Sequence, residues 1–309
     1  MNELFSGLEH LGFKEIEISN LYGSNKDEKV EHTSKEAPKK TLTYQTTVTC
    51  PVCANIFKEK AVKSSSFRVA SKDTDFFIRY EIINPYFYDV WICNKCGYSA
   101  LKVDFPKLRE NEAKLVLQNI TPKFKSKEFP EDYDISIAIE RYKMALINAV
   151  YTEAKASKKA MICLKIAWMY RLLGSENSKE TERNFLKEAL TGFEQAYMKE
   201  IFPIYGMDSH IMMYLIGELN RRLSKYSIAL NWLSKLITSK GVKPNLKELA
   251  RTQKDLIKDE LMLQKKVELN GELLNTENMN LEVDDETSTE VKQVLNNKKS
   301  FLNLFKKTN

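Results

Sequence analysis

Hydrophobic and polar positions divide the chain into four stretches with different patterns. In residues 1–21 apolar side chains recur at helical spacing, which predicts a short helix. Residues 22–43 are polar and charged without a period, as is typical of a linker. We therefore expect 1–43 to form an N-terminal helix and a flexible linker, with the helix either packed on the body or docked on a partner.

The second stretch, residues 44–110, is rich in aromatic and β-branched side chains. Apolar and polar positions alternate over 62–70 and 86–92, which predicts short strands because successive side chains of a strand point to opposite faces. The dipeptide Asn84-Pro85 marks a turn. A small β-rich module is expected here.

The third stretch, residues 111–267, has a helical period over most of its length. Ser178 and Asp208 are expected N-caps, because a short side-chain oxygen can accept from an N–H of the first turn. Asn245 followed by Glu248 predicts a capping box. The predicted helices are 132–153, 158–173, 179–201, 208–223, 225–239 and 246–267.

Parts of this helical stretch resemble tetratricopeptide units, in which small residues lie where paired helices cross. Gly217 and Ala229 occupy such positions in the better copy, and Ala167 and Ala189 do so in a looser one. Segment 175–184 makes the looser copy about ten residues too long for a standard unit. We expect stacked helical hairpins with a concave face suited to a peptide or a partner helix.

The fourth stretch, residues 268–309, separates its charges. Acidic residues occur without lysine or arginine in 268–290, and lysines occur without acids in 291–309. Opposed charge blocks with few aromatics predict a mobile tail. Apolar residues in 291–305 also allow a short docking helix.

Composition narrows the class of protein. The chain has 309 residues, 43% hydrophobic and 29% charged, as expected of a soluble protein of about two domains. No stretch supplies the ~20 apolar residues of a membrane helix, and the N-terminus lacks the features of a secretory signal. We expect a cytoplasmic protein that does not bind a membrane. The net charge of +6 indicates a lysine-rich surface.

Four of the five cysteines form two Cys-x-x-Cys pairs, and they suggest a redox site, disulfides or a metal site. The pairs are Cys50 with Cys53 and Cys93 with Cys96. A reducing cytoplasm disfavours structural disulfides. A thioredoxin-type site needs one pair at the start of a helix, whereas each pair here follows a strand-like segment. Two such turns complete a tetrahedron of thiolates around Zn²⁺, which is the favoured interpretation. An iron–sulfur cluster or a redox pair is the alternative.

The residues around the pairs fit zinc knuckles. Pro51 fixes the first loop, and Gly97 permits the positive φ that points a backbone amide at a sulfur. Ala54 occupies the matching position of the first pair, so that turn is either strained or differently shaped. Four thiolates leave no open coordination position, which predicts a structural Zn²⁺. Cys163 is expected to be a buried small hydrophobe, and Phe57, Trp91 and Tyr98 are expected to shield the metal.

Several strings together resemble a known bacterial family. They are CPVC, KAVKSSSFRV, DTDF, NPYFYDVWICNKCGYSALKVDF, IERYKMALINAVY and LKIAWMYRLLG, within residues 1–240. In these strings the chain resembles domain-of-unknown-function (DUF) family 2225. The resemblance implies paired zinc knuckles followed by tetratricopeptide-type hairpins, and it brings no established activity. The expected fold class is α+β, mostly α, with a zinc-ribbon-like module before tetratricopeptide-like hairpins.

Three functions are compatible with these patterns. The favoured one is a non-enzymatic zinc-binding adaptor or scaffold with an unknown protein or peptide partner. The alternative is nucleic-acid binding, because basic and aromatic residues alternate in the β module. Catalysis is disfavoured, since no phosphate loop, nucleophile elbow or His-bearing metal motif occurs. The basic residues are Lys58, Lys60, Lys63, Arg68, Lys72 and Arg79, and the acidic candidates for catalysis are Asp73, Asp75 and Asp89.

Overall fold

A computed structural model of the protein describes residues 42–277, with side chains up to residue 264. The predicted N-terminal helix and the predicted docking helix at 291–305 lie outside this range. The domain boundaries proposed from the sequence, 1–43, 44–110, 111–267 and 268–309, stay predictions.

The N-terminal part is built from three two-stranded antiparallel ribbons. Each ribbon pairs two strands that follow one another along the chain. Alternation over 62–70 predicts one strand, but the chain turns away there through the short 3-10 helix Ser64–Ser66. The strands are β1 (Thr43–Thr49), β2 (Ile56–Val62), β3 (Val69–Lys72), β4 (Ile78–Tyr80), β5 (Val90–Ile92) and β6 (Ser99–Leu101).

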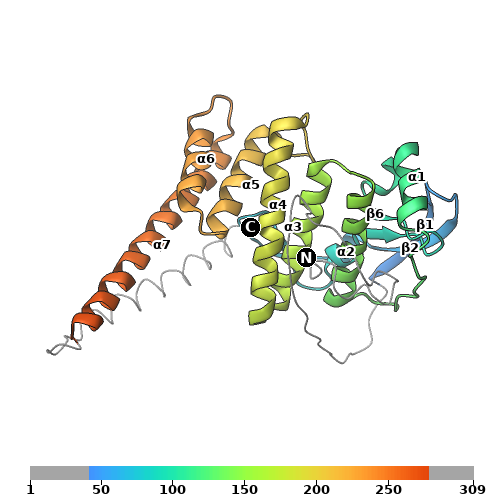
Figure 1. Ribbon diagram of the computed structural model, residues 1–309, viewed down its shortest axis with the longest axis horizontal. Coiled ribbons are helices and arrows are strands. Elements are labelled where there is room, and N and C mark those ends of the chain that lie inside the picture. The colour runs from blue at the N-terminus through green and yellow to red at the C-terminus, as the bar shows by residue number, and fades with distance from the viewer. Residues whose placement is uncertain (1–41, 278–309) are drawn as a thin grey trace.

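The rest of the described chain is helical, and the structure confirms a mostly α protein with a small β part (Figure 1). Each of the six predicted helices has a counterpart. The sequence pattern did not predict α1, because it is a polar helix that buries only Glu112 and Val116. The helices are α1 (Glu110–Asn119), α2 (Ile135–Tyr151), α3 (Ala156–Leu173), α4 (Glu176–Lys199), α5 (Ser209–Arg222), α6 (Tyr226–Thr238) and α7 (Pro244–Glu277).

One predicted helix cap is correct and two are wrong. The Asp208 carboxylate accepts from the Ile211 N–H at 2.8 Å and caps α5. Ser178 does not cap α4, because the helix begins earlier and Ser175 is its N-cap. Asn245 lies inside α7, which begins at Pro244, where the fixed φ of proline suits the first helical turn.

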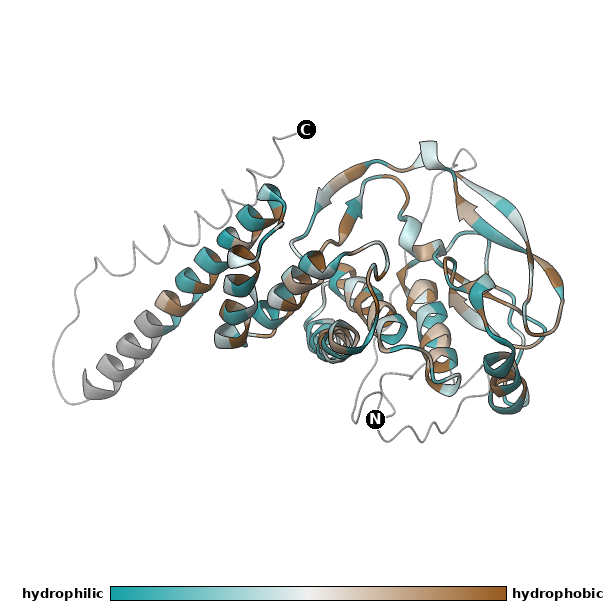
Figure 2. Cartoon of the chain, turned by 90° about the horizontal axis from the view of Figure 1, so that it is seen from above, coloured by the Kyte–Doolittle hydropathy of each residue, from teal (hydrophilic) through white to brown (hydrophobic). Residues whose placement is uncertain are grey.

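The helices form consecutive antiparallel hairpins that stand in a row (Figure 2). The β1–β2 and β5–β6 ribbons lie at one end of the row and α7 at the other, while the β3–β4 ribbon lies alongside α3 and α5. Gly217 allows α5 and α6 to approach closely, since a Cβ there would lie 2.9 Å from Leu233 Cδ2. Segment 175–184 is no linker: it forms the first turns of α4 and lengthens that helix. No helix in the described part is both long and apolar enough to cross a bilayer.

The buried core is continuous between the β ribbons and the helices. One hydrophobic cluster includes Cys50, Phe77 and Phe105 and extends through α2, α3 and α4 to Leu223. A second cluster joins α5, α6 and the first half of α7. The cysteine pairs are therefore packed against the helical part and do not project from it.

Candidate metal centre

The two Cys-x-x-Cys turns have the same backbone hydrogen bonds. In the first, between β1 and β2, the Ala54 N–H donates to Cys50 O at 3.0 Å. In the second, between β5 and β6, the Gly97 N–H donates to Cys93 O at 2.8 Å. A second backbone hydrogen bond closes each turn. The Cys50 N–H donates to Asn55 O in the first turn, and the Cys93 N–H donates to Tyr98 O in the second.

The sequence left open whether the first turn is strained at Ala54 or has a different shape, and the backbone at Ala54 answers this. Gly97 has φ +76° and Ala54 has φ +54°, so both turns use the left-handed conformation. The first turn therefore has the expected shape with an alanine in a conformation that costs an L-residue about 1 kcal/mol or more. Gly97 is also required by space, because a Cβ there would lie 2.5 Å from Phe124 Cγ.

The four predicted ligand sulfurs converge. Their Sγ atoms all lie within 4.8 Å of one another. The Cys50–Cys96 and Cys53–Cys93 Sγ distances are both 3.6 Å. A disulfide needs about 2.05 Å, whereas a tetrahedron with Zn–S bonds of about 2.3 Å spaces its sulfurs about 3.8 Å apart. The donor set therefore fits a tetrahedral metal ion bound by four thiolates.

Contact among the clustered thiols shifts pKa values in both directions, and contacts with Cys50 and Cys96 lower the pKa of Cys93. Cys50, Cys93 and Cys96 are buried and Cys53 is half-buried. Contact with Cys93 and burial raise the pKa of the Cys50 thiol to about 12. Contacts with Cys50 and Cys93, together with burial, also raise the pKa of Cys96. A bound divalent cation would displace these protons and neutralise the crowded thiolates.

The three aromatic residues predicted to shield the metal pack around Phe105, which no sequence pattern marked. Phe105 is fully buried, and its ring lies 4.7 Å from that of Tyr98, 5.7 Å from that of Trp91 and 6.1 Å from that of Phe57, measured between centroids. Phe105 follows the last strand in a short 3-10 helix, so no strand or helix period marks it. These rings form the small core beside the thiol turns.

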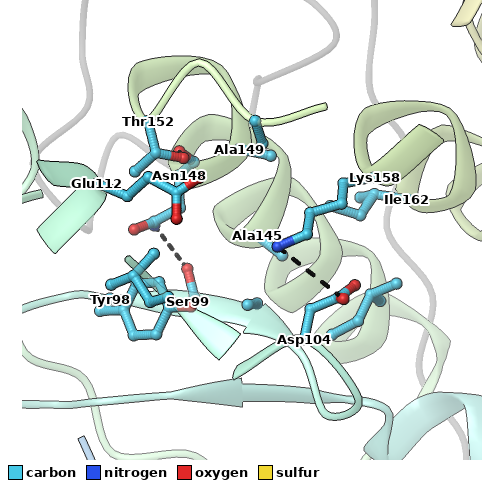
Figure 3. A pocket seen from close by; sticks show the side chains of 14 residues that line it. Tyr98, Ser99, Asp104, Glu112, Ala145, Asn148, Ala149, Thr152, Lys158 and Ile162 are labelled. Carbon is cyan, nitrogen blue, oxygen red and sulfur yellow. Dashed lines mark hydrogen bonds and ion pairs between the residues drawn. The ribbon is translucent and has the colours of Figure 1, made fainter. Parts of the chain in front are cut away.

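Side chains from the helical part hold the second turn. Thr121 Oγ1 donates to Cys96 O at 2.9 Å, and Asn148 Nδ2 donates to Gly97 O at 3.1 Å. Asn148 also donates to Ser99 Oγ at 2.7 Å, as Figure 3 shows. The position of the second cysteine pair therefore depends on α2 and on the segment before it.

A cavity beside Asn148 is too small for an organic substrate. It lies between β6 and helices α1, α2 and α3, and Asp104, Glu112 and Lys158 are among its lining residues (Figure 3). Its volume is about 30 Å³, which admits one or two water molecules. The Oδ1 atom of Asn148 has no protein partner, and such a water can satisfy it.

The remaining cysteine and the acidic candidates lie outside the cysteine cluster, and the acidic candidates have partners within the fold. Cys163 is fully buried in α3, as expected of a small hydrophobe, and burial raises the pKa of its thiol. Within residues 42–264, the four clustered cysteines are the one group of three or more His, Cys, Asp or Glu side chains that lie close enough together to share a metal ion. Asp89 pairs with Lys165. Asp73 accepts from Arg79 at 2.9 and 3.0 Å.

Asp75 belongs to an ion network that joins the β3–β4 turn to the helices. It is fully buried and accepts from Arg171 of α3 and from Trp168 Nε1 at 3.1 Å. Next to it, Thr74 donates to the buried Glu218 of α5, which also accepts from Arg222 Nε at 2.7 Å. The β3–β4 turn is thus fixed against α3 and α5.

Some of the basic residues proposed for nucleic-acid contact, and one aromatic residue that lies among them in the sequence, have partners within the fold. Arg79 is paired with Asp73, and Phe77 is fully buried and stacked on Trp168 at 5.2 Å. Lys60 donates to Pro130 O at 3.2 Å. These side chains have structural partners, and the nucleic-acid interpretation stays a prediction.

Comparison with known proteins gives one match. Residues 43–257 match the family model described as "Uncharacterized protein conserved in bacteria (DUF2225)". No curated protein and no solved structure matches the chain.

Proposed function

The chain belongs to the bacterial family DUF2225, and from this premise we propose that it is a non-enzymatic adaptor in which Zn²⁺ has a structural role. Cys50, Cys53, Cys93 and Cys96 would bind the ion, and the helical hairpins would present a surface to a partner protein. The observation that carries the proposal is the convergence of the four sulfurs within 4.8 Å. A four-thiolate site leaves no coordination position for a substrate.

The connection between the two parts supports an adaptor. The second thiol turn is bonded to α2 through Asn148, and the β3–β4 turn is bonded to α3 through Asp75. Zinc binding would therefore fix the β ribbons and, through these contacts, the adjoining helices as one unit. A rigid surface loses little conformational entropy when it binds a partner, which favours recognition.

The ligand chemistry supports zinc over other metals. Thiolates favour Zn²⁺, Cu⁺ and iron–sulfur clusters, and tetrahedral sulfur sites are typical of Zn²⁺ and iron–sulfur centres. The two closely packed Cys-x-x-Cys turns, without a further sulfur ligand nearby, suit a single ion. The zinc proposal fails if the purified chain contains iron and absorbs in the visible range.

The adaptor proposal is tested by capture from the native host. Tagged full-length protein is crosslinked in cells, and recovered proteins are quantified against a tag-only control over replicate cultures. One or more partners recovered in every replicate support the proposal. The absence of any reproducible partner from a preparation that contains about one zinc per chain would contradict it.

A further inference from the structure

The β1 strand has an open edge at one end of the molecule (Figure 1). Its register with β2 is unbroken over the seven residues Thr43–Thr49, and among the described residues β2 is its one strand partner. The ribbon is fixed on the body through one face, because the buried Glu59 of β2 accepts from the Ile92 N–H at 2.9 Å. The other edge of β1 therefore carries backbone groups that no described strand pairs.

The other strands of the β part have the features that keep a sheet edge single. Such features are short strands, charged side chains and irregular register. β2 carries Lys58 and Lys60. β3 has four residues and a register shift between Val69 and Ser71, and β4, β5 and β6 have three residues each. In contrast, β1 is long and regular, and it contains neither a charged residue nor a proline.

Alternate residues of β1 direct their backbone groups away from β2. In an antiparallel pair, residues that exchange hydrogen bonds with the neighbour alternate with residues that do not. Leu42 O accepts from the Lys63 N–H at 3.1 Å, and at the other end the Cys50 N–H donates to Asn55 O at 2.9 Å. The even-numbered residues of β1 thus bond to β2. The residues that point to the open edge are Thr43, Gln45, Thr47 and Thr49.

The sequence of β1 is complementary to itself in the antiparallel direction. If two copies pair with Thr46 at the centre, Tyr44 of each copy lies opposite Val48 of the other, and Gln45 lies opposite Thr47. Aromatic residues opposite β-branched ones and threonine opposite threonine are pairs that stabilise sheets. This register also places outward residues opposite outward residues, so that their N–H and C=O groups can bond. No like charges meet, and the Tyr44 side chain, 50% exposed, gains a neighbour.

We propose that β1 pairs with β1 of a second copy about a twofold axis at Thr46. The two ribbons then form one four-stranded antiparallel sheet. A surface that is complementary to itself under a twofold rotation is the form that most homodimer interfaces take. β1 carries no charge that would select the strand of a different protein. The inference goes beyond the proposed adaptor function and does not depend on it.

The test is the oligomeric state of the full-length protein, measured by sedimentation equilibrium over a range of concentrations. We expect the wild type to dimerise. Gln45→Glu with Thr47→Glu should weaken dimerisation about tenfold or more, because like charges then lie directly opposite across the axis. Within one copy the same positions lie opposite Lys60 and Lys58 of β2. The substitution therefore opposes the dimer while it leaves the fold at least as stable, which thermal unfolding checks.

A matched variant tests the register. Gln45→Glu with Thr47→Lys should restore the dimer, because the glutamate of each copy then faces the lysine of the other. A proline pair tests the backbone groups. Thr47→Pro removes an N–H that points to the open edge, so it should prevent dimerisation with a small effect on folding. Thr46→Pro removes an N–H that bonds to β2, so it should reduce the stability of the fold itself.

Hydrogen exchange gives a direct readout. The amides of Gln45 and Thr47 should exchange more slowly at high than at low protein concentration in the wild type, and equally at both in the double glutamate variant. A wild-type chain that stays monomeric at about 1 mM would overturn the proposal. A dimer that the double glutamate variant does not weaken would also overturn it, and so would failure of the glutamate–lysine variant to restore the dimer. Partner capture by the monomeric variant would leave the adaptor function standing in each case.

Discussion

The guanidinium of Arg171 donates one hydrogen bond to each oxygen of the Asp75 carboxylate, at 3.0 and 2.7 Å. Asp75 lies at the tip of the β3–β4 turn and Arg171 near the end of α3, and the carboxylate is fully buried. A planar guanidinium matches a carboxylate in this two-bond geometry. The pair fixes the β part of the chain on the helical part.

This pair predicts a pH dependence of stability. Burial by itself would raise the pKa of Asp75, but Arg222 and Arg171 lower it from 3.8 to about 2. Because the folded-state pKa lies below the unfolded-state value, the stabilisation is complete above about pH 4 and is lost as the pH falls through 2. It corresponds to about 2 kcal/mol of the free energy of unfolding.

Asp75→Asn should therefore be about 2 kcal/mol less stable than the wild type at pH 7, and the difference should vanish between pH 4 and pH 2. Urea unfolding measured at several pH values checks this. Asp255→Asn, at an exposed site paired with Lys258, should change stability little at any pH. A wild-type minus Asp75→Asn difference that is constant with pH would contradict the prediction.

Replacing one cysteine of the cluster should remove the metal. We expect about one zinc per wild-type chain by elemental analysis, and loss of zinc with loss of near-UV circular dichroism in Cys93→Ser. Cys163→Ala is the matched control, because that thiol is fully buried but lies outside the cluster. It should keep its zinc. Zinc retained by Cys93→Ser would rule out the assigned ligand set.

Two glycines with the same backbone conformation should respond differently to alanine. Gly97 and Gly206 both have φ +76°. A Cβ at Gly97 meets Phe124 at 2.5 Å, whereas nothing lies within 4 Å of one at Gly206. Gly97→Ala should cost about 3 kcal/mol, from strain and overpacking, and Gly206→Ala about 1 kcal/mol, from strain alone. Chemical unfolding of both variants measures this, and equal losses would disprove the steric role of Phe124.

A buried ion pair offers a test of how β2 is held on α2. Arg141 Nη2 lies 2.8 Å from Glu59 Oε2, and both side chains are almost fully buried. Glu59→Leu should destabilise the protein by about 3–5 kcal/mol, because it leaves the Arg141 guanidinium buried without a counter-charge. Adding Arg141→Met should recover most of that loss. Chemical unfolding curves of the single and double variants give the free energy of unfolding of each. A double variant as unstable as Glu59→Leu would contradict this account.

The sequence by itself determined most of the helices and the identity of the candidate ligands, but not α1 or the strand break at Ser64–Ser66. Helical periods located α2 to α7, since burial of one face imposes a regular spacing of apolar residues. The spacing of Cys50 with Cys53 and of Cys93 with Cys96 marked two thiol turns, because each turn is formed by residues that are neighbours in the sequence. Local rules failed at Ser178, where an equally suitable Ser175 three residues earlier caps the helix.

Only the tertiary structure decided what these local pieces do together. It brought the two thiol turns within bonding range of one ion, placed Phe105 among their aromatics, and paired Asp75 with Arg171 across 96 positions of the chain. No period or spacing encodes such pairings, because they depend on how distant surfaces pack. The same packing paired Asp73 with Arg79, Asp75 with Arg171 and Asp89 with Lys165, since a buried charge is stable only when an opposite charge meets it.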